Sequence, residues 1–127
     1  GSGSIVNISS LAVLEAYPYI GYKTMKTAVI ALTQNLAMAH ADAGVRVNAI
    51  LPGLMNTPMA IEARVAAGMP REELVQMRNN RVPLGKRMGT AWDVAYAALC
   101  LHSDEAQFIS GIWLPVDGAA WASQGKY

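Results

Sequence analysis

The chain is poor in cysteine, in net charge and in long apolar runs. Cys100 is the only cysteine, so no disulfide can form within the chain, and a reducing cytoplasm is the expected compartment. A formal net charge of +1 gives no reason to propose nucleic acid as a partner. No apolar stretch reaches the ~20 residues that a membrane span requires. The 127 residues, of which 53% are hydrophobic, are therefore expected to form one modest domain with neither nucleic acid nor membrane as a partner.

Two further absences concern metal ligands and targeting signals. No second histidine, cysteine or carboxylate cluster lies at metal-ligand spacing beside His40 or His102, so no metal site is expected. Residues 1–4, Gly-Ser-Gly-Ser, lack the basic start and the apolar core of a signal peptide. They could be a linker or a native turn before the apolar segment that follows, and the sequence leaves both open.

Three apolar segments predict strands. Residues 4–9, rich in β-branched side chains, suit a strand buried on both faces, and residues 45–51 suit a second strand that Pro52 and Gly53 terminate. Residues 112–114 predict a third strand, closed by a turn over 115–118. The order strand, helix, strand, long excursion, helix, strand is typical of a parallel α/β sheet.

Helices are predicted between these strands. A long helix is expected from about residue 19 to residue 43, ended by Gly44. A second helix is expected over 94–102, preceded by the capping-box-like sequence that begins at Thr90. The buried stripe of the long helix is predicted to consist of Met25, Ala28, Val29, Leu32, Leu36 and Ala39.

Residues 54–88 differ in character from the rest of the chain. Two short helical patterns, over 59–67 and 71–79, are separated by Gly68 and Pro70. Flexible methionine side chains indicate either a mobile lid over a substrate or a surface excursion in which methionine fills gaps. Five of the seven methionines lie in this segment: Met55, Met59, Met69, Met77 and Met88.

The same segment is basic. Six basic residues outnumber three acidic ones, which could favour an acidic substrate such as an acyl thioester carrier. Such charges are more often a solvated face, so this alternative stays open. The basic residues are Arg64, Arg71, Arg78, Arg81, Lys86 and Arg87.

The chemistry is expected at Tyr22 and Lys26, which lie four residues apart on the long helix and therefore share one face. The lysine ammonium favours the ionised form of the phenol, which makes the tyrosine a better proton-transfer group. A serine at the end of the first strand, Ser9 or Ser10, supplies a hydrogen-bond donor for an oxygen on which charge develops. Together these residues can protonate or deprotonate an alcohol or ketone oxygen.

The order of motifs resembles the C-terminal half of a short-chain dehydrogenase/reductase, over essentially the whole chain. Four elements follow one another at separations like those of that family: the strand ending in Asn-Ile-Ser-Ser at 7–10, Tyr22-x3-Lys26, Val-Arg-Val-Asn running into Pro-Gly at 45–53, and Val-Asp-Gly at 116–118. The fold that this resemblance implies is the C-terminal part of a Rossmann-like, doubly wound parallel sheet with a helical lid insertion. The resemblance also favours the lid interpretation of residues 54–88.

The resemblance implies a role for each catalytic residue. Tyr22 would be the general acid and base, and Lys26 would favour its ionised form and hydrogen-bond the nicotinamide ribose. Ser10, the second serine of the pair, would hold the substrate oxygen. Ser9 is the competing candidate because the segment from the serines to Tyr22 is slightly shorter than in many relatives.

The resemblance also implies a nicotinamide site. Tyr22 and Lys26 would contribute to it together with Pro52, Gly53, Met55 and Thr57, a segment that is similar to the family's Pro-Gly-x-x-x-Thr sequence. The cofactor would be NAD or NADP, and these residues do not distinguish the two. No Gly-rich phosphate loop follows a first strand, so the N-terminal dinucleotide-binding half is expected to be absent from residues 1–127.

The implied function is an NAD(P)-dependent oxidoreductase that interconverts a secondary alcohol and a ketone, with reduction of a 3-oxoacyl thioester as one case. Small-molecule alcohols or ketones are the expected partners, and the full-length form is expected to be a homo-oligomer. The alternative is a non-catalytic fragment or assembly half that lacks cofactor binding, because the same motifs record only the ancestry of the full subunit.

Overall fold

The computed structural model describes residues 1–124. Its strands are β1 (Gly3–Ile8), β2 (Val45–Pro52) and β3 (Trp113–Val116). Its α-helices are α1 (Ile20–Ala39), α2 (Pro58–Ala66), α3 (Arg71–Asn80) and α4 (Ala91–His102). Three short 3-10 turns, η1 (Leu11–Leu14), η2 (Ala41–Ala43) and η3 (Asp104–Ala106), complete the elements of this part of the chain.

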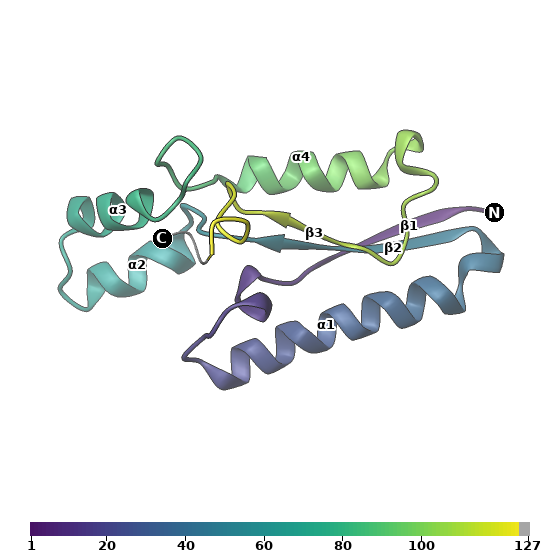
Figure 1. The fold of residues 1–127 in the computed structure, drawn as a ribbon, viewed down its shortest axis with the longest axis horizontal. Helices are drawn as coiled ribbons and strands as arrows, with labels where there is room; N and C mark the ends of the chain where they lie inside the picture. Colours follow the sequence, from purple (N-terminus) through teal and green to yellow (C-terminus); the bar gives the residue numbers. More distant parts are fainter. Residues whose placement is uncertain (125–127) are drawn as a thin grey trace.

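The strands form a parallel sheet in the order β1-β2-β3. Ile5 pairs with Val47, and Ala49 pairs with Trp113. The long helix α1 covers one face of the sheet and α4 covers the other (Figure 1). Parallel strands joined by helices on both faces make a Rossmann-like α/β arrangement, as the alternation of the sequence predicted.

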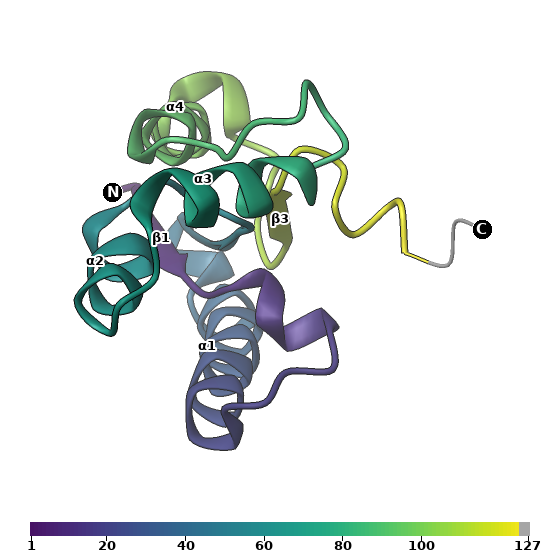
Figure 2. The ribbon, with the colours of Figure 1, turned by 90° about the vertical axis from the view of Figure 1, so that its left-hand side faces the viewer.

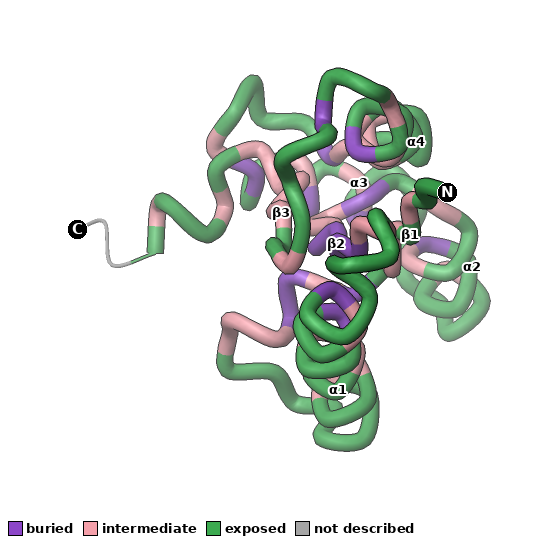
Figure 3. Tube along the Cα trace, turned by 90° about the vertical axis from the view of Figure 1, so that its right-hand side faces the viewer, coloured by how far each residue is buried: buried purple, intermediate pink, exposed green. Residues whose placement is uncertain are grey.

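The centre of the fold is β2, where residues 47–51 are all fully buried. Figure 3 shows the buried segments gathered around this strand, while the outer turns of α1 are exposed. The buried amide of Asn48 donates to the carbonyl of Ile109 at 2.8 Å and accepts from the amide of Ile112 at 3.2 Å. These bonds satisfy a polar side chain that would otherwise be costly to bury, and they fix the start of β3 beside β2.

The expectation that the first strand is buried on both faces is wrong for this part of the chain. Ile5 is 42% exposed and Ile8 is 44% exposed. Within residues 1–124, β1 pairs only with β2, so it forms an edge of the sheet.

The predicted apolar stripe of α1 is only partly correct, because Val29 and Leu36 are half-buried but the other members are exposed. Met25 is 69% exposed and Leu32 is 51% exposed, whereas Thr33 and Ala37 are buried. Thr33 can be buried because its hydroxyl donates to the carbonyl of Val29 at 2.7 Å and accepts from the Asn7 side chain at 3.0 Å. The helix therefore turns a face to the sheet that includes Val29, Ile30 and Leu36 together with the polar Thr33.

Element ends differ slightly from those predicted. The long helix stops at Ala39 and a 3-10 turn follows, so the expected end at residue 43 is too late. Gly44 ends that turn with φ 71°, in the left-handed region that glycine adopts without strain, which agrees with the predicted helix-ending role. Strand β3 extends to Val116, so the turn expected over 115–118 begins only at Asp117.

The excursion places α2 and α3 beyond the carboxyl ends of the strands, at the same end of the sheet as η1 (Figures 1 and 2). Ile61 of α2, Leu74 of α3 and Met88 form a buried apolar cluster between these helices. This cluster supports the two short helices that the sequence predicted, and it positions them above the strand ends where parallel sheets bind ligands.

Candidate active site

The two serines at the end of β1 have different surroundings. Ser9 is 3% exposed, and its hydroxyl donates to the main-chain carbonyl of Lys26 at 2.8 Å. Ser10 is half-buried and caps η1, accepting from the amide of Ala12 at 3.2 Å. A hydroxyl that accepts one hydrogen bond can still donate another, so Ser10 keeps a donor for a ligand oxygen while Ser9 uses its donor in packing.

Tyr22 and Lys26 lie on consecutive turns of α1, as their spacing predicted. The Lys26 ammonium is 5.8 Å from the centre of the Tyr22 ring. It donates to the carbonyl of Ile8 at 3.1 Å, which fixes the side chain at the end of β1. Tyr22 is 36% exposed, so its phenol is open to a ligand beside a held positive charge.

Tyr17 packs beside Tyr22 and Tyr19 packs beside Tyr17, an aromatic wall that the sequence reasoning missed. The ring of Tyr17 lies 5.6 Å from that of Tyr22 and 5.6 Å from that of Tyr19. The Lys23 ammonium donates to the carbonyl of Glu15 and so ties this loop to α1. The Tyr-Pro-Tyr sequence just before the helix was the available signal for such an aromatic wall.

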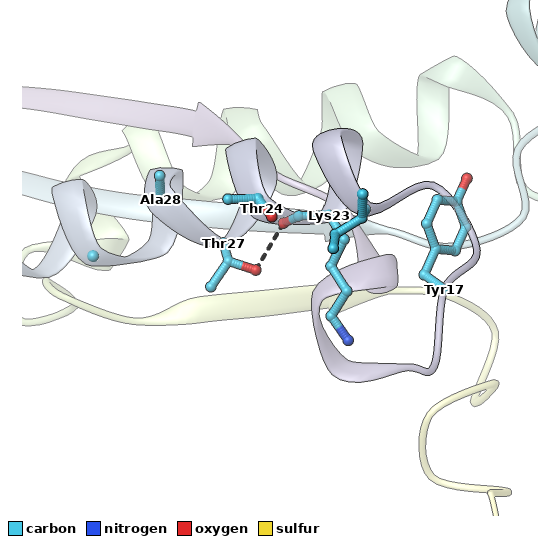
Figure 4. A pocket seen from close by; sticks show the side chains of 7 residues that line it. Tyr17, Lys23, Thr24, Thr27 and Ala28 are labelled. Carbon is cyan, nitrogen blue, oxygen red and sulfur yellow. Dashed lines mark hydrogen bonds between the residues drawn. The ribbon is translucent and has the colours of Figure 1, made fainter.

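An open pocket of about 550 Å³ borders this wall along α1 (Figure 4). Tyr17, Lys23 and Thr27 contribute to its lining, and the Thr27 hydroxyl donates to the carbonyl of Lys23 at 2.8 Å. None of Ser10, Tyr22 and Lys26 lines it, so it lies beside the candidate catalytic residues and does not contain them.

The predicted nicotinamide segment runs from the end of β2 into α2. Gly53 packs so tightly that an added Cβ would lie 2.7 Å from the Cβ of Asp117. Glycine therefore permits a close approach of this segment to the 117–118 turn. Pro52 is the last residue of β2.

Met55 and Thr57 follow on the same segment. Met55 forms a parallel bridge with Gly89, in which Gly89 donates to the carbonyl of Leu54 at 3.0 Å and accepts from the amide of Asn56 at 2.8 Å. The amide and carbonyl of Met55 itself are not used in this bridge, because parallel pairing bonds the flanking residues. Thr57 is the N-cap of α2 and its hydroxyl makes no capping hydrogen bond. The amide and carbonyl of Met55 and the hydroxyl of Thr57 are the kinds of donor and acceptor that a nicotinamide carboxamide can bind.

Residues 1–124 contain no group of three or more His, Cys, Asp or Glu residues that could hold a metal ion. None of the helices in that range is long and apolar enough to cross a membrane.

Comparison with known proteins identifies the family. Residues 1–119 match the family model described as enoyl-(acyl carrier protein) reductase. The chain is also similar to a crystal structure from Burkholderia thailandensis described as an oxidoreductase of the short-chain dehydrogenase/reductase family, with a TM-score of 0.84 and 35% identity. The chain belongs to the short-chain dehydrogenase/reductase family. The family resemblance noted from the sequence is confirmed, and so is the α/β Rossmann-like fold class.

Individual members of the short-chain dehydrogenase/reductase family show how much of a subunit is aligned. The chain is 43% identical over 121 residues to 2,5-dichloro-2,5-cyclohexadiene-1,4-diol dehydrogenase LinX of Sphingobium indicum, covering 93% of this chain and 44% of that protein. The Burkholderia match covers 94% of this chain and 45% of that one. A variant of ElxO with NADPH bound matches with a TM-score of 0.80 and 32% identity, covering 94% of this chain and 46% of that structure. The chain thus spans about half the length of the relatives it matches.

Proposed function

We propose that this chain carries the catalytic face of an NAD(P)-dependent oxidoreductase that interconverts a secondary alcohol and a ketone. The observation that carries the proposal is the Lys26 ammonium, held 5.8 Å from the Tyr22 ring by the carbonyl at the end of β1. Its relatives in the short-chain dehydrogenase/reductase family include a dehydrogenase of a cyclic diol and a protein with NADPH bound, which supports the same chemistry.

Each residue has one task in this proposal. Ser10 donates a hydrogen bond to the substrate oxygen and holds it at the mouth of the site. Tyr22 gives a proton to that oxygen in reduction and takes it in oxidation, and Lys26 stabilises the phenolate that results. The nicotinamide, when bound, supplies or accepts the hydride.

This chain's own groups would hold part of the cofactor. The rest would be held by the half of the subunit that the relatives contain and that this chain does not align with. Lys26 would hydrogen-bond the ribose, and Met55 and Thr57 would bind the carboxamide, on the side of the segment that the bridge to Gly89 leaves free. Pro52 and Gly53 set the position of this segment against the 117–118 turn.

The finer statements of the proposal concern the substrate and the lid. The segment of residues 54–88 would cover a bound substrate, since α2 and α3 lie beyond the strand ends. A 3-oxoacyl thioester is one substrate that the basic character of this segment favours. The full-length form would be a homo-oligomer, consistent with the exposed apolar residues on α1 and α4.

Substitution of Tyr22 tests the proposal. In the full-length subunit, Tyr22→Phe is expected to remove nearly all turnover of a secondary alcohol while nicotinamide cofactor binding changes little, because only the proton-transfer group is lost. Tyr19→Phe is the matched control, since Tyr19 is 61% exposed and precedes the helix. Near-native turnover in Tyr22→Phe would contradict the mechanism.

A further inference from the structure

Arg78 on α3 is a buried cation without an anionic partner among residues 1–124. Its side chain is 7% exposed, and its one hydrogen bond there runs from Nε to the sulfur of Met88 at 3.2 Å. The ion pairs within this range join Arg71 to Glu62 and Arg87 to Asp93, and neither includes Arg78. A thioether is only a weak acceptor, so most of the donor capacity of this guanidinium is unused.

The surroundings of Arg78 disfavour its positive charge. Burial lowers the pKa of Arg78, and the positive charges of Arg64 and Arg81 lower it further. No fully buried side-chain nitrogen or oxygen among residues 1–124 lacks a hydrogen-bond partner, so the terminal nitrogens of Arg78 still reach solvent, although no carboxylate in this range pairs with them. The solvated-face interpretation of the basic residues in 54–88 therefore fails for Arg78, although it suits Arg81, which is exposed.

The position of Arg78 relates it to the candidate active site. Helix α3 lies beyond the carboxyl ends of the strands, where η1 and the loop leading into α1 also lie (Figure 1). The Tyr17 ring in that loop is 5.6 Å from the Tyr22 ring, so α3 and the proton-transfer group lie at the same end of the sheet.

We propose that Arg78 binds a carboxylate on the substrate, so that the preferred substrates are secondary alcohols or ketones that carry an acidic group away from the reacting carbon. The proposal rests on the proposed function for the identity of the reacting end. With Nε directed at Met88, the two terminal nitrogens remain for the paired hydrogen bonds that a guanidinium makes with a carboxylate. The bound anion would pair with a charge that no carboxylate among residues 1–124 compensates.

Binding of matched ligand pairs to the full-length subunit saturated with its reduced cofactor tests the proposal. The probes are butanoate, cyclohexanecarboxylate and benzoate, each paired with its neutral primary amide, and affinities are measured by isothermal titration. In the unsubstituted protein at least one carboxylate should bind roughly tenfold or more tightly than its amide, the advantage of a charge-assisted hydrogen bond. In Arg78→Met, which keeps the length of the side chain, that ratio should fall to about one.

Two variants separate anion binding from a structural role. Arg81→Met removes an exposed arginine just beyond α3 and should keep the carboxylate preference. Arg78→Lys keeps the charge without the planar fork and should retain part of the preference, which keeps the test decisive if Arg78→Met fails to fold. Equal affinity for carboxylates and amides in the unsubstituted protein would overturn the proposal. An undiminished preference for carboxylates in a folded Arg78→Met variant would also overturn it. A variant that lost only affinity for the cofactor would do the same.

The outcome is separable from that of the proposed function. Tyr22→Phe should retain the carboxylate preference while turnover is lost, because Tyr22 does not contact the proposed anion. A protein that prefers carboxylates through Arg78 but does not oxidise secondary alcohols would keep the anion site and refute only the proposed reaction.

Discussion

The hydroxyl of Ser9 and the main-chain carbonyl of Lys26 are joined by a 2.8 Å hydrogen bond that fastens the end of β1 to the second turn of α1. The Lys26 side chain returns to the same strand end, where its ammonium donates to the carbonyl of Ile8. These two contacts fix the separation between the serines and Tyr22. They also give the two serines separable roles, which mutation can measure.

Alanine substitutions should distinguish the serines in the full-length subunit. Ser10→Ala is expected to lower turnover by ~10²-fold or more, the usual loss for one donor at a developing oxyanion. Ser9→Ala is expected to lower the free energy of unfolding by ~0.5–1.5 kcal/mol, the net contribution of one hydrogen bond, because the carbonyl of Lys26 keeps its bond within α1. Steady-state kinetics and denaturant unfolding of both variants check this. If Ser9→Ala abolished turnover and Ser10→Ala did not, Ser9 would be the substrate-binding serine.

Gly53→Ala is expected to destabilise the protein. The new Cβ would lie 2.7 Å from the Cβ and 2.9 Å from the Cα of Asp117, so the backbone of one segment must move. Overpacking of this kind costs ~1–3 kcal/mol, which thermal or denaturant unfolding would detect. Gly21→Ala is the matched control because an added Cβ at Gly21 meets nothing within 4 Å in helix α1. That control should leave stability unchanged or raise it by ~0.5–1 kcal/mol, and an equal loss in both variants would refute the packing argument.

Helix α4 is expected to lose stability in acid through Asp93. Hydrogen bonds from the amide of Thr90 at 2.7 Å and from its hydroxyl at 3.0 Å hold the pKa of Asp93 below its usual value, and Arg87 lowers it further. Since the folded-state pKa is depressed, the stabilisation is fully present above the unfolded-state pKa of ~3.9. It is lost as pH falls through the lower folded-state value.

The measurement is the difference in denaturant midpoint between the unsubstituted protein and Asp93→Asn. It should be constant at neutral pH and should shrink as the pH falls from about 5 to about 2. Asp104→Asn removes an exposed carboxylate outside α4 and serves as the control. A difference that does not vary with pH would show that the Asp93 carboxylate does not stabilise the cap.

The 127-residue chain made on its own is expected to self-associate. Its edge strand β1 exposes Ile5 and Ile8, and an unpaired apolar strand is a template for association. Light scattering should show assemblies larger than a monomer. Lysine at both positions should reduce them, whereas Leu84→Lys, at an exposed residue outside the strands, should not. A monodisperse monomer in the unsubstituted chain would contradict this expectation.

The elements of the fold were largely predictable because each depends on short-range patterns. The β-branched run around Val47 and the Thr90–Asp93 cap specify their strand and helix locally, and both are confirmed. The buried face of α1 was only partly predictable, because its polar member depends on a pair formed between elements. The hydroxyl of Thr33 accepts from Asn7 of β1 and donates to the carbonyl of Val29 in α1.

The candidate site divides in the same way. The spacing of Tyr22 and Lys26 follows from helix geometry and could be predicted, whereas the difference between Ser9 and Ser10 depends on which hydroxyl meets the α1 backbone. The burial of Arg78 could not be predicted from the sequence for a similar reason. In the sequence it is one of six basic residues in the excursion, and only packing against Met88 distinguishes it.

The contact between Gly53 and Asp117 bears on how related sequences should be interpreted. Selection for packing alone would preserve this glycine, so a descendant that had lost all catalysis would still carry the Pro-Gly pair. That pair is therefore a marker of architecture and a poor diagnostic of enzymatic competence. Under the proposed mechanism, a related chain that lacks Tyr22 or Lys26 would have lost the reaction, whereas one that lacks Gly53 would have changed only its packing.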